Sequence, residues 1–275
     1  MIQKIKVNGI SLAVRIEGEN KKGDIMLIHC LGLSHRVFEE QIKFLSQNGF
    51  RVIAPDVRCH GDSEKVDKEV TMWDLTDDIF GLVDKLGIKR LFCLGGISMG
   101  GMISMRMMLR RPDIAQKLIL MGTSADYDPY KERYTPIIED MMKIYKTGDT
   151  DKIKQAFRNS AEFIVRICFS QKYLEIGDNF EKWVSESLKG MSLGALYVSQ
   201  AVIMRDSILN NIKNINVPTL ILAGSGDIAV PVSESEKIAR EIKGSKLVIF
   251  DSAPHIFPPE IPEKTNKEIE NFLSV

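Results

Sequence analysis

The chain has 275 residues, of which 44% are hydrophobic, 27% charged and 7% aromatic, a composition that excludes a disordered, collagen-like or disulfide-stapled protein. Its 37 Lys and Arg residues balance 37 Asp and Glu residues, so the chain lacks the basic field that binds nucleic acid or an anionic membrane. We therefore expect a small-molecule partner, with no nucleic acid and no membrane involved.

A β-hairpin is predicted at the start of the chain. Two alternating stretches, Lys4–Val7 and Leu12–Glu17, flank the turn dipeptide Asn8-Gly9, which is a strong hairpin signal. Apolar runs of strand length then alternate with segments of helical period. The predicted strands are 25–29, 50–54, 91–94 and 117–121, and the predicted helices are 37–47, 71–86 and 99–110.

The helix 71–86 has the clearest boundaries. Thr71 and Asp74 form an acidic capping box at its start, and Gly87 ends it. Strands that are apolar throughout and separated by helices predict a parallel sheet covered on both faces.

The alternation stops after Met121, and residues 124 to about 212 form an irregular helical stretch. Strand-like runs return at 218–223 and 246–250, and a closing helix starts near Pro262. The pattern predicts one α/β core interrupted by a helical insertion.

Residues 91–102 are the most informative stretch, because Gly96-Ile97-Ser98-Met99-Gly100 lies between a predicted strand and a predicted helix. A G-x-S-x-G match alone is a weak signal. Here the glycines on either side of Ser98 allow a sharp strand-to-helix turn, which exposes the serine hydroxyl at a helix N-terminus. Ser98 is therefore the candidate nucleophile.

A serine nucleophile needs a base, and the base needs an orienting acid. His255 follows the last predicted strand, on a loop at the sheet edge that also carries Ser98. Asp227 follows the preceding strand and can meet His255 from the neighbouring loop. Asp251 is the rival acid, less favoured because it ends its own strand too close to the base.

With its Ser, Asp, His order, the sequence resembles the α/β-hydrolase family. Four segments carry the resemblance: His29-Cys-Leu-Gly-Leu-Ser34 resembles the oxyanion loop, 56–63 the D-x-R-G-H-G-x-S loop, 224–231 the acid loop, and Ala253-Pro-His255 the histidine loop. Segments 32–36, 83–88 and 100–102 are most similar to the 3-oxoadipate enol-lactonase branch and its carboxylesterase relatives.

This resemblance implies the α/β-hydrolase fold, with a mostly parallel eight-stranded sheet, helices on both faces and a helical cap. The core would comprise residues 1–123 and 213–275, and the cap residues 124–212. It also implies an oxyanion hole formed by the backbone N–H groups of Leu31 and Met99.

Four cysteines, Cys30, Cys59, Cys93 and Cys168, are scattered along the chain without zinc-type spacing. We expect reduced thiols and no metal, in a cytoplasmic protein without a signal peptide or membrane span. Cys30 and Cys59 stand where the family usually has glycine. A positive φ at either position would carry a strain of about 1–3 kcal/mol.

The expected activity is hydrolysis of small carboxylic esters or lactones through an acyl-enzyme, with no cofactor. A C–C bond hydrolase of diketone-type substrates and a ligand receptor or signalling protein on the same fold remain alternatives. Arg158, Arg166 and Arg205 are unranked candidates to bind an anionic lactone. Helical periodicity identifies neither the pocket-lining residues of the cap nor the oligomeric state.

Overall fold

The computed structural model describes residues 2–274, and within them eight strands form one sheet in the order β1-β2-β4-β3-β5-β6-β7-β8. The strands are β1 (Ile2–Val7), β2 (Ile10–Glu17), β3 (Asp24–Ile28), β4 (Arg51–Pro55), β5 (Leu91–Ile97), β6 (Ala115–Met121), β7 (Thr219–Gly224) and β8 (Lys246–Phe250). β2 pairs antiparallel with β1 and β4, and the other neighbours are parallel. The predicted α/β fold and the eight-stranded sheet are confirmed.

Both faces of the sheet are covered, which explains why the central strands are apolar throughout. Met26 and Ile28 of β3 pack into one core with the helices α2 (Met72–Lys85) and α3 (Met99–Arg110). The alternate residues Ile25 and Leu27 pack into a second core with α1 (Glu39–Gln47) and α10 (Pro262–Leu273). The remaining core helix, α9 (Val232–Glu241), lies between β7 and β8 in the chain.

Several local predictions are confirmed. The hairpin turns at Asn8 and Gly9, both with positive φ. The capping box of α2 has both hydrogen bonds, between Thr71 and Asp74. β5 is longer than predicted and runs to Ile97, because its two glycines pair with β3 and β6 on either side.

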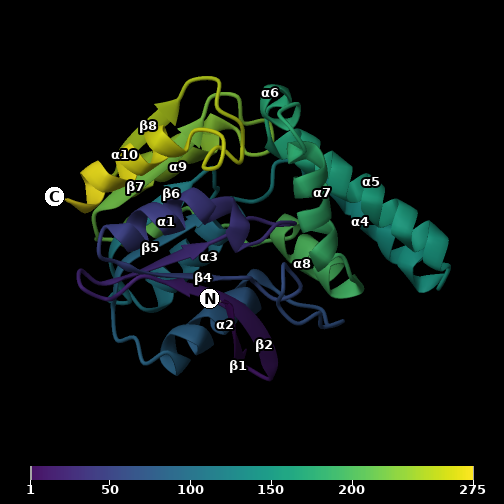
Figure 1. The fold of residues 1–275 in the computed structure, drawn as a ribbon, viewed down its shortest axis with the longest axis horizontal. Coiled ribbons are helices and arrows are strands. Elements are labelled where there is room, and N and C mark those ends of the chain that lie inside the picture. Colours follow the sequence, from purple (N-terminus) through teal and green to yellow (C-terminus); the bar gives the residue numbers. More distant parts are fainter. Residues whose placement is uncertain (1, 275) are drawn as a thin grey trace.

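The helical insert comprises the helices between β6 and β7. They are α4 (Lys131–Lys146), α5 (Thr150–Cys168), α6 (Gln171–Leu174), α7 (Asn179–Gly190) and α8 (Leu193–Ile203). In Figure 1 they lie together on one side of the sheet, in teal and green. No helix within residues 2–274 is long and apolar enough to cross a membrane.

The insert is tied to the loop that follows β3. Glu186 of α7 is buried, accepts a hydrogen bond from Ser34, and lies 3.4 Å from Arg36 Nε and 2.8 Å from Lys189 Nζ. The two ends of the insert meet as well, since Ile208 N–H donates to the Ala125 carbonyl at 2.8 Å. The insert is thereby fixed beside the carboxyl ends of the parallel strands.

Candidate active site

Ser98 lies at the sharp turn between β5 and α3, with φ 53° and ψ −118°. A positive φ in a non-glycine residue costs about 1–3 kcal/mol and persists only where the surroundings enforce it. A Cβ on Gly96 would lie 2.2 Å from the Gly100 carbonyl carbon, and a Cβ on Gly100 would lie 1.9 Å from the Ile28 oxygen. Close packing therefore requires both glycines of the G-x-S-x-G pattern.

Three hydrogen bonds hold the strained turn. The Ser98 N–H donates to the Met121 carbonyl at 2.9 Å. The Ser98 carbonyl accepts from the Thr123 hydroxyl at 2.7 Å and from the Met102 N–H at 3.1 Å. The backbone of Ser98 is thus fixed while its side chain stays at the N-terminus of α3.

His255 and Asp227 form a buried pair. His255 Nδ1 lies 2.7 Å from Asp227 Oδ2. The other carboxylate oxygen accepts from the backbone N–H groups of Ala229 and Val230 at 2.9 and 2.8 Å. Both oxygens are therefore engaged, and the carboxylate fixes the imidazole. The rival acid, Asp251, is exposed and meets Ser225 instead.

Ser98 and His255 line the same cavity, which has a volume of about 190 Å³. Within residues 2–274, neither the Ser98 hydroxyl nor His255 Nε2 takes part in a hydrogen bond, so both are free to react with a molecule in the cavity. Gly122 adjoins the pair, with φ 44°; a Cβ there would lie 3.3 Å from Asp227 Oδ2 and 3.4 Å from His255 Nδ1. Gly122 is not among the residues predicted from the sequence, although it directly follows the predicted strand 117–121.

The two expected oxyanion donors are Leu31, which borders this cavity, and Met99, which follows Ser98 in the chain. Leu31 lines the cavity, and its N–H has no acceptor within the described chain. Met99 is the first residue of α3, so its N–H has no partner inside the helix. An unpaired N–H group at a helix N-terminus favours a nearby negative charge.

Buried histidines order the loops beneath the oxyanion loop. His29 Nδ1 lies 2.7 Å from the Cys30 carbonyl, and its Nε2 accepts from the Val57 N–H at 2.8 Å. Burial lowers the pKa of His29, and it lowers the pKa of His60 to about 3. Both imidazoles are therefore neutral at pH 7, and neither lines the cavity.

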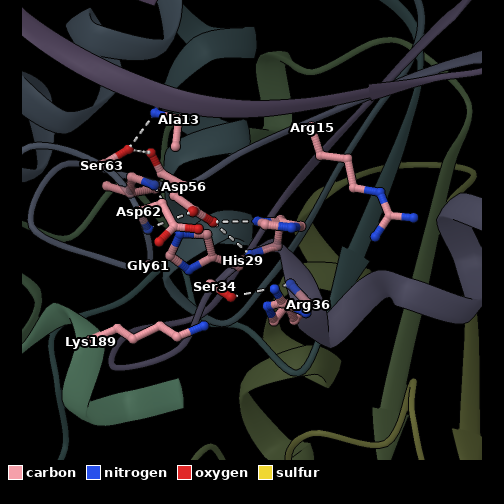
Figure 2. A network of polar contacts seen from close by, with 12 residues as sticks. Ala13, Arg15, His29, Ser34, Arg36, Asp56, Gly61, Asp62, Ser63 and Lys189 are labelled. Atoms are coloured by element: carbon pink, nitrogen blue, oxygen red, sulfur yellow. Dashed lines mark hydrogen bonds and ion pairs between the residues drawn. The ribbon is translucent and has the colours of Figure 1, made fainter. Parts of the chain in front are cut away.

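Asp56 is the centre of the polar network in Figure 2. Its carboxylate accepts from the His35 N–H at 2.9 Å, from His35 Nδ1 at 2.8 Å and from the Asp62 N–H at 2.9 Å. Burial alone would raise the pKa of Asp56, but the hydrogen bonds from the side chain and backbone of His35 outweigh it and bring the pKa to about 2. This acid orders loops and does not reach the cavity.

The two cysteines at usual glycine positions differ. Cys59 has φ 63°, so the expected strain is present there, and its sulfur lies 3.4 Å from the Val66 nitrogen. Cys30 is not among the residues with positive φ. Burial raises the pKa of the Cys30 thiol to about 12, which makes it unreactive at neutral pH.

The wall of the cavity is mainly apolar and comes mostly from the insert. Leu31 and Met102 contribute from the core, and the insert contributes Tyr134, Ile137, Ile138, Met141, Phe163, Ile164, Ile167, Leu196, Val202 and Ile203. Of the three candidate arginines, only Arg205 lines it. Arg158 pairs with Glu162 and Glu181, and Arg166 lies over the Phe180 ring.

Comparisons with known proteins agree with this geometry. The model of the alpha/beta hydrolase fold family matches residues 25–260. The chain is 30% identical to the AB hydrolase superfamily protein YisY of Bacillus subtilis over 257 residues, 90% of each chain. A thermophilic esterase from Thermogutta terrifontis superposes with a TM-score of 0.86 at 27% identity, covering 100% of this chain and 98% of that one. The enol-lactonase from Burkholderia xenovorans LB400 superposes with a TM-score of 0.88 at 26% identity, covering 99% of this chain and 100% of that one.

Proposed function

The chain belongs to the α/β hydrolase fold family, and from that premise we propose that it is a serine hydrolase of small carboxylic esters or lactones, acting through an acyl-enzyme without a cofactor. The observation that carries the proposal is the meeting of Ser98, at its strained turn, with the His255–Asp227 pair at one cavity. The similarity to an esterase and an enol-lactonase over nearly their whole lengths supports this substrate class.

In the proposed acylation, Ser98 Oγ attacks the substrate carbonyl carbon while His255 Nε2 takes the hydroxyl proton. The carboxylate of Asp227 keeps Nδ1 protonated and stabilises the imidazolium that forms. The negative oxygen of the tetrahedral intermediate accepts hydrogen bonds from the N–H groups of Leu31 and Met99, each worth about 10²–10³ in rate. The carbon–oxygen bond then breaks, and the leaving alkoxide takes the proton from His255.

Deacylation repeats the same steps with water. His255 takes a proton from a water molecule, whose oxygen attacks the acyl carbon on Ser98. The second tetrahedral intermediate collapses, the bond to Ser98 Oγ breaks, and the proton returns from His255 to the serine. The products are the carboxylic acid and the free enzyme.

We also propose that residues 124–212 act as a cap on a core of residues 1–123 and 213–275. The support is the cavity wall, because half of its lining residues lie on α4, α5 and α8 of the insert. Hydrophobic side chains from these helices would bury an apolar substrate group next to Ser98. Substrate size would then depend on the insert rather than on the core.

Steady-state hydrolysis of p-nitrophenyl esters of increasing chain length, together with several lactones, tests the proposal. We expect turnover of at least one class, and a loss of about 10⁶ in kcat in the variant Ser98→Ala, by analogy with a related triad. The matched control is Ser160→Ala, because Ser160 also lines the cavity but has no hydrogen bond within the described chain. Turnover that survives in Ser98→Ala would refute the proposal, and turnover only of diketone substrates would favour C–C bond hydrolysis.

A further inference from the structure

Among the described residues, two acidic side chains, Asp128 and Glu234, and one basic side chain, Arg205, line the cavity together with His255. Arg205 follows α8, where the insert returns to the core, and is only 5% exposed. Its Nη1 lies 2.7 Å from Asp128 Oδ2, and its Nε donates to the Asp126 carbonyl at 2.8 Å. Asp128 therefore neutralises the positive charge of Arg205 within the site itself.

One nitrogen of Arg205 is still available. Nη1 also donates to the Val202 carbonyl at 2.9 Å, but Nη2 has no acceptor among residues 2–274. Nη2 is not sealed inside the protein, unlike the unpaired Nε of Arg106. Arg205 lines the cavity and also borders a surface groove beside Trp73 and Asp206. Nη2 is the guanidinium donor left to bond an oxygen of a molecule bound in the cavity.

Glu234 adds a negative charge to the same cavity. It is 5% exposed, accepts from the Ser124 hydroxyl at 2.6 Å, and lies 2.8 Å from Lys237 Nζ. Lys237 does not line the cavity, and it also pairs with Asp126. Asp128, Arg205 and Glu234 together carry a formal charge of −1, and adding Lys237 and Asp126 leaves it at −1.

A carboxylate that entered this cavity would lose its hydration shell. It would find no cation whose charge is not already balanced by an acidic side chain. Burying a charge without a partner is costly, and like charges placed together across a binding site repel each other. A neutral oxygen would escape both penalties and still accept a hydrogen bond from Arg205 Nη2. The site is therefore matched to an uncharged acceptor.

We propose that Arg205 determines specificity by donating a hydrogen bond from Nη2 to a second, neutral acceptor oxygen of the substrate, such as a ketone or ester oxygen. Asp128 and Glu234 exclude substrates that carry a carboxylate at that place. This inference rests on the proposed ester or lactone hydrolysis at Ser98, and it selects neutral substrates over anionic lactones.

Methyl esters test the proposal, because their small leaving group leaves the acyl part to fill the cavity. Dimethyl glutarate, monomethyl glutarate and methyl heptanoate have acyl parts of similar length and differ in the second group, which is a neutral ester, a carboxylate or an alkyl chain. At pH 7.5 we expect kcat/KM for dimethyl glutarate to exceed that for monomethyl glutarate about tenfold or more. The kcat/KM for dimethyl glutarate should also exceed the kcat/KM for methyl heptanoate about threefold to tenfold, which is the effect of one hydrogen bond.

Three variants assign these ratios to residues. Asp128→Asn removes the negative charge that balances Arg205. Glu234→Gln removes a negative charge while keeping an acceptor for Ser124. Each variant should lower the ratio of kcat/KM for dimethyl glutarate to kcat/KM for monomethyl glutarate about threefold or more. Arg205→Lys keeps a cation for Asp128 but lacks the second guanidinium nitrogen, and should bring the ratio of dimethyl glutarate to methyl heptanoate close to one. Glu236→Gln, on α9 but outside the cavity, is the control and should leave both ratios unchanged.

A binding measurement separates this inference from the proposed function. Calorimetry with the variant Ser98→Ala should detect tighter binding of dimethyl glutarate than of the monomethyl glutarate anion, even if no ester is hydrolysed by the native enzyme. Equal or tighter binding of the anion, or no binding of either compound, would overturn the role of Arg205. Failure of the native enzyme on all three esters and on p-nitrophenyl acetate would instead refute the proposed hydrolysis.

Discussion

His255 Nδ1 lies 2.7 Å from Asp227 Oδ2, although the two residues follow different strands, β8 and β7. Since these strands are parallel neighbours, their carboxyl ends bring the two loops together. A Cβ on Gly224 would lie 2.1 Å from the Ala253 carbonyl oxygen. A glycine at the end of β7 therefore allows the loops to approach closely enough for this hydrogen bond.

The pairing predicts the effect of replacing the acid. Asp227→Asn keeps the size of the side chain but removes the charge that orients the imidazole, and we expect kcat for the best ester to fall about 10⁴-fold. Asp251→Asn is the matched control, because Asp251 is exposed and does not contact His255. An equal loss in both variants, or in neither, would contradict the assignment of the acid.

Gly122 provides a second prediction, because it combines a positive φ with a position beside the His255–Asp227 pair. Gly122→Ala should lower the melting temperature through backbone strain of about 1–3 kcal/mol, and should also lower kcat because the new methyl group crowds Asp227 and His255. Gly148→Ala is the control: φ there is 70°, but nothing lies within 4 Å of a new Cβ. We expect this control to lose stability without losing kcat, and a normal kcat in Gly122→Ala would contradict the crowding.

The buried loop histidines predict how stability depends on pH. The pKa of His60 is about 3 in the folded chain, below the ordinary value of about 6.5, so the unfolded chain binds the proton first. The free energy of unfolding should thus fall as the pH drops from about 6.5 towards 3, by about 1.4 kcal/mol per pH unit for each such group. Burial also lowers the pKa of His29, so this residue should likewise make the free energy of unfolding fall as the pH drops. Asp56 has a pKa of about 2 in the folded chain, below its ordinary value of 3.8. Its protonation should therefore lower the free energy of unfolding further as the pH falls below about 3.8.

Urea unfolding at a series of pH values measures this dependence. His60→Gln serves as the comparison, because it removes one of the groups that must stay neutral in the fold. We expect a shallower decline between pH 6 and 4 in that variant. Identical slopes in the variant and the native protein would rule out His60 as a source of acid lability.

The sheet and the catalytic candidates could be predicted from the sequence because their signals are local. Strand periodicity, the Asn8-Gly9 turn and the glycines around Ser98 each depend on only a few neighbouring residues. The rules for parallel sheets then predict that the loops carrying Asp227 and His255 meet at the carboxyl edge, whereas the strand order itself comes from the structure. Those rules predict which loops lie at the carboxyl edge of the sheet, but they do not predict how the helical insert packs over it.

The wall of the cavity could not be predicted in the same way. Among the aromatic residues of the insert, Tyr134 and Phe163 line the cavity. Helical periodicity could not identify them, because it reveals an apolar face but not which helix that face meets. Arg205 differs from the other two candidate arginines because it follows α8 rather than lying on an exposed helix face. Only the three-dimensional crossing of the insert and the core determines that difference.

The account depends most on Ser98 being an activated nucleophile, and labelling with a fluorophosphonate probe tests this directly. We predict one phosphonyl group per chain, located by peptide mass spectrometry on Ser98, slower labelling in Asp227→Asn and none at this position in Ser98→Ala. Absence of labelling in the folded native protein, or an adduct on another serine that persists in Ser98→Ala, would contradict the account.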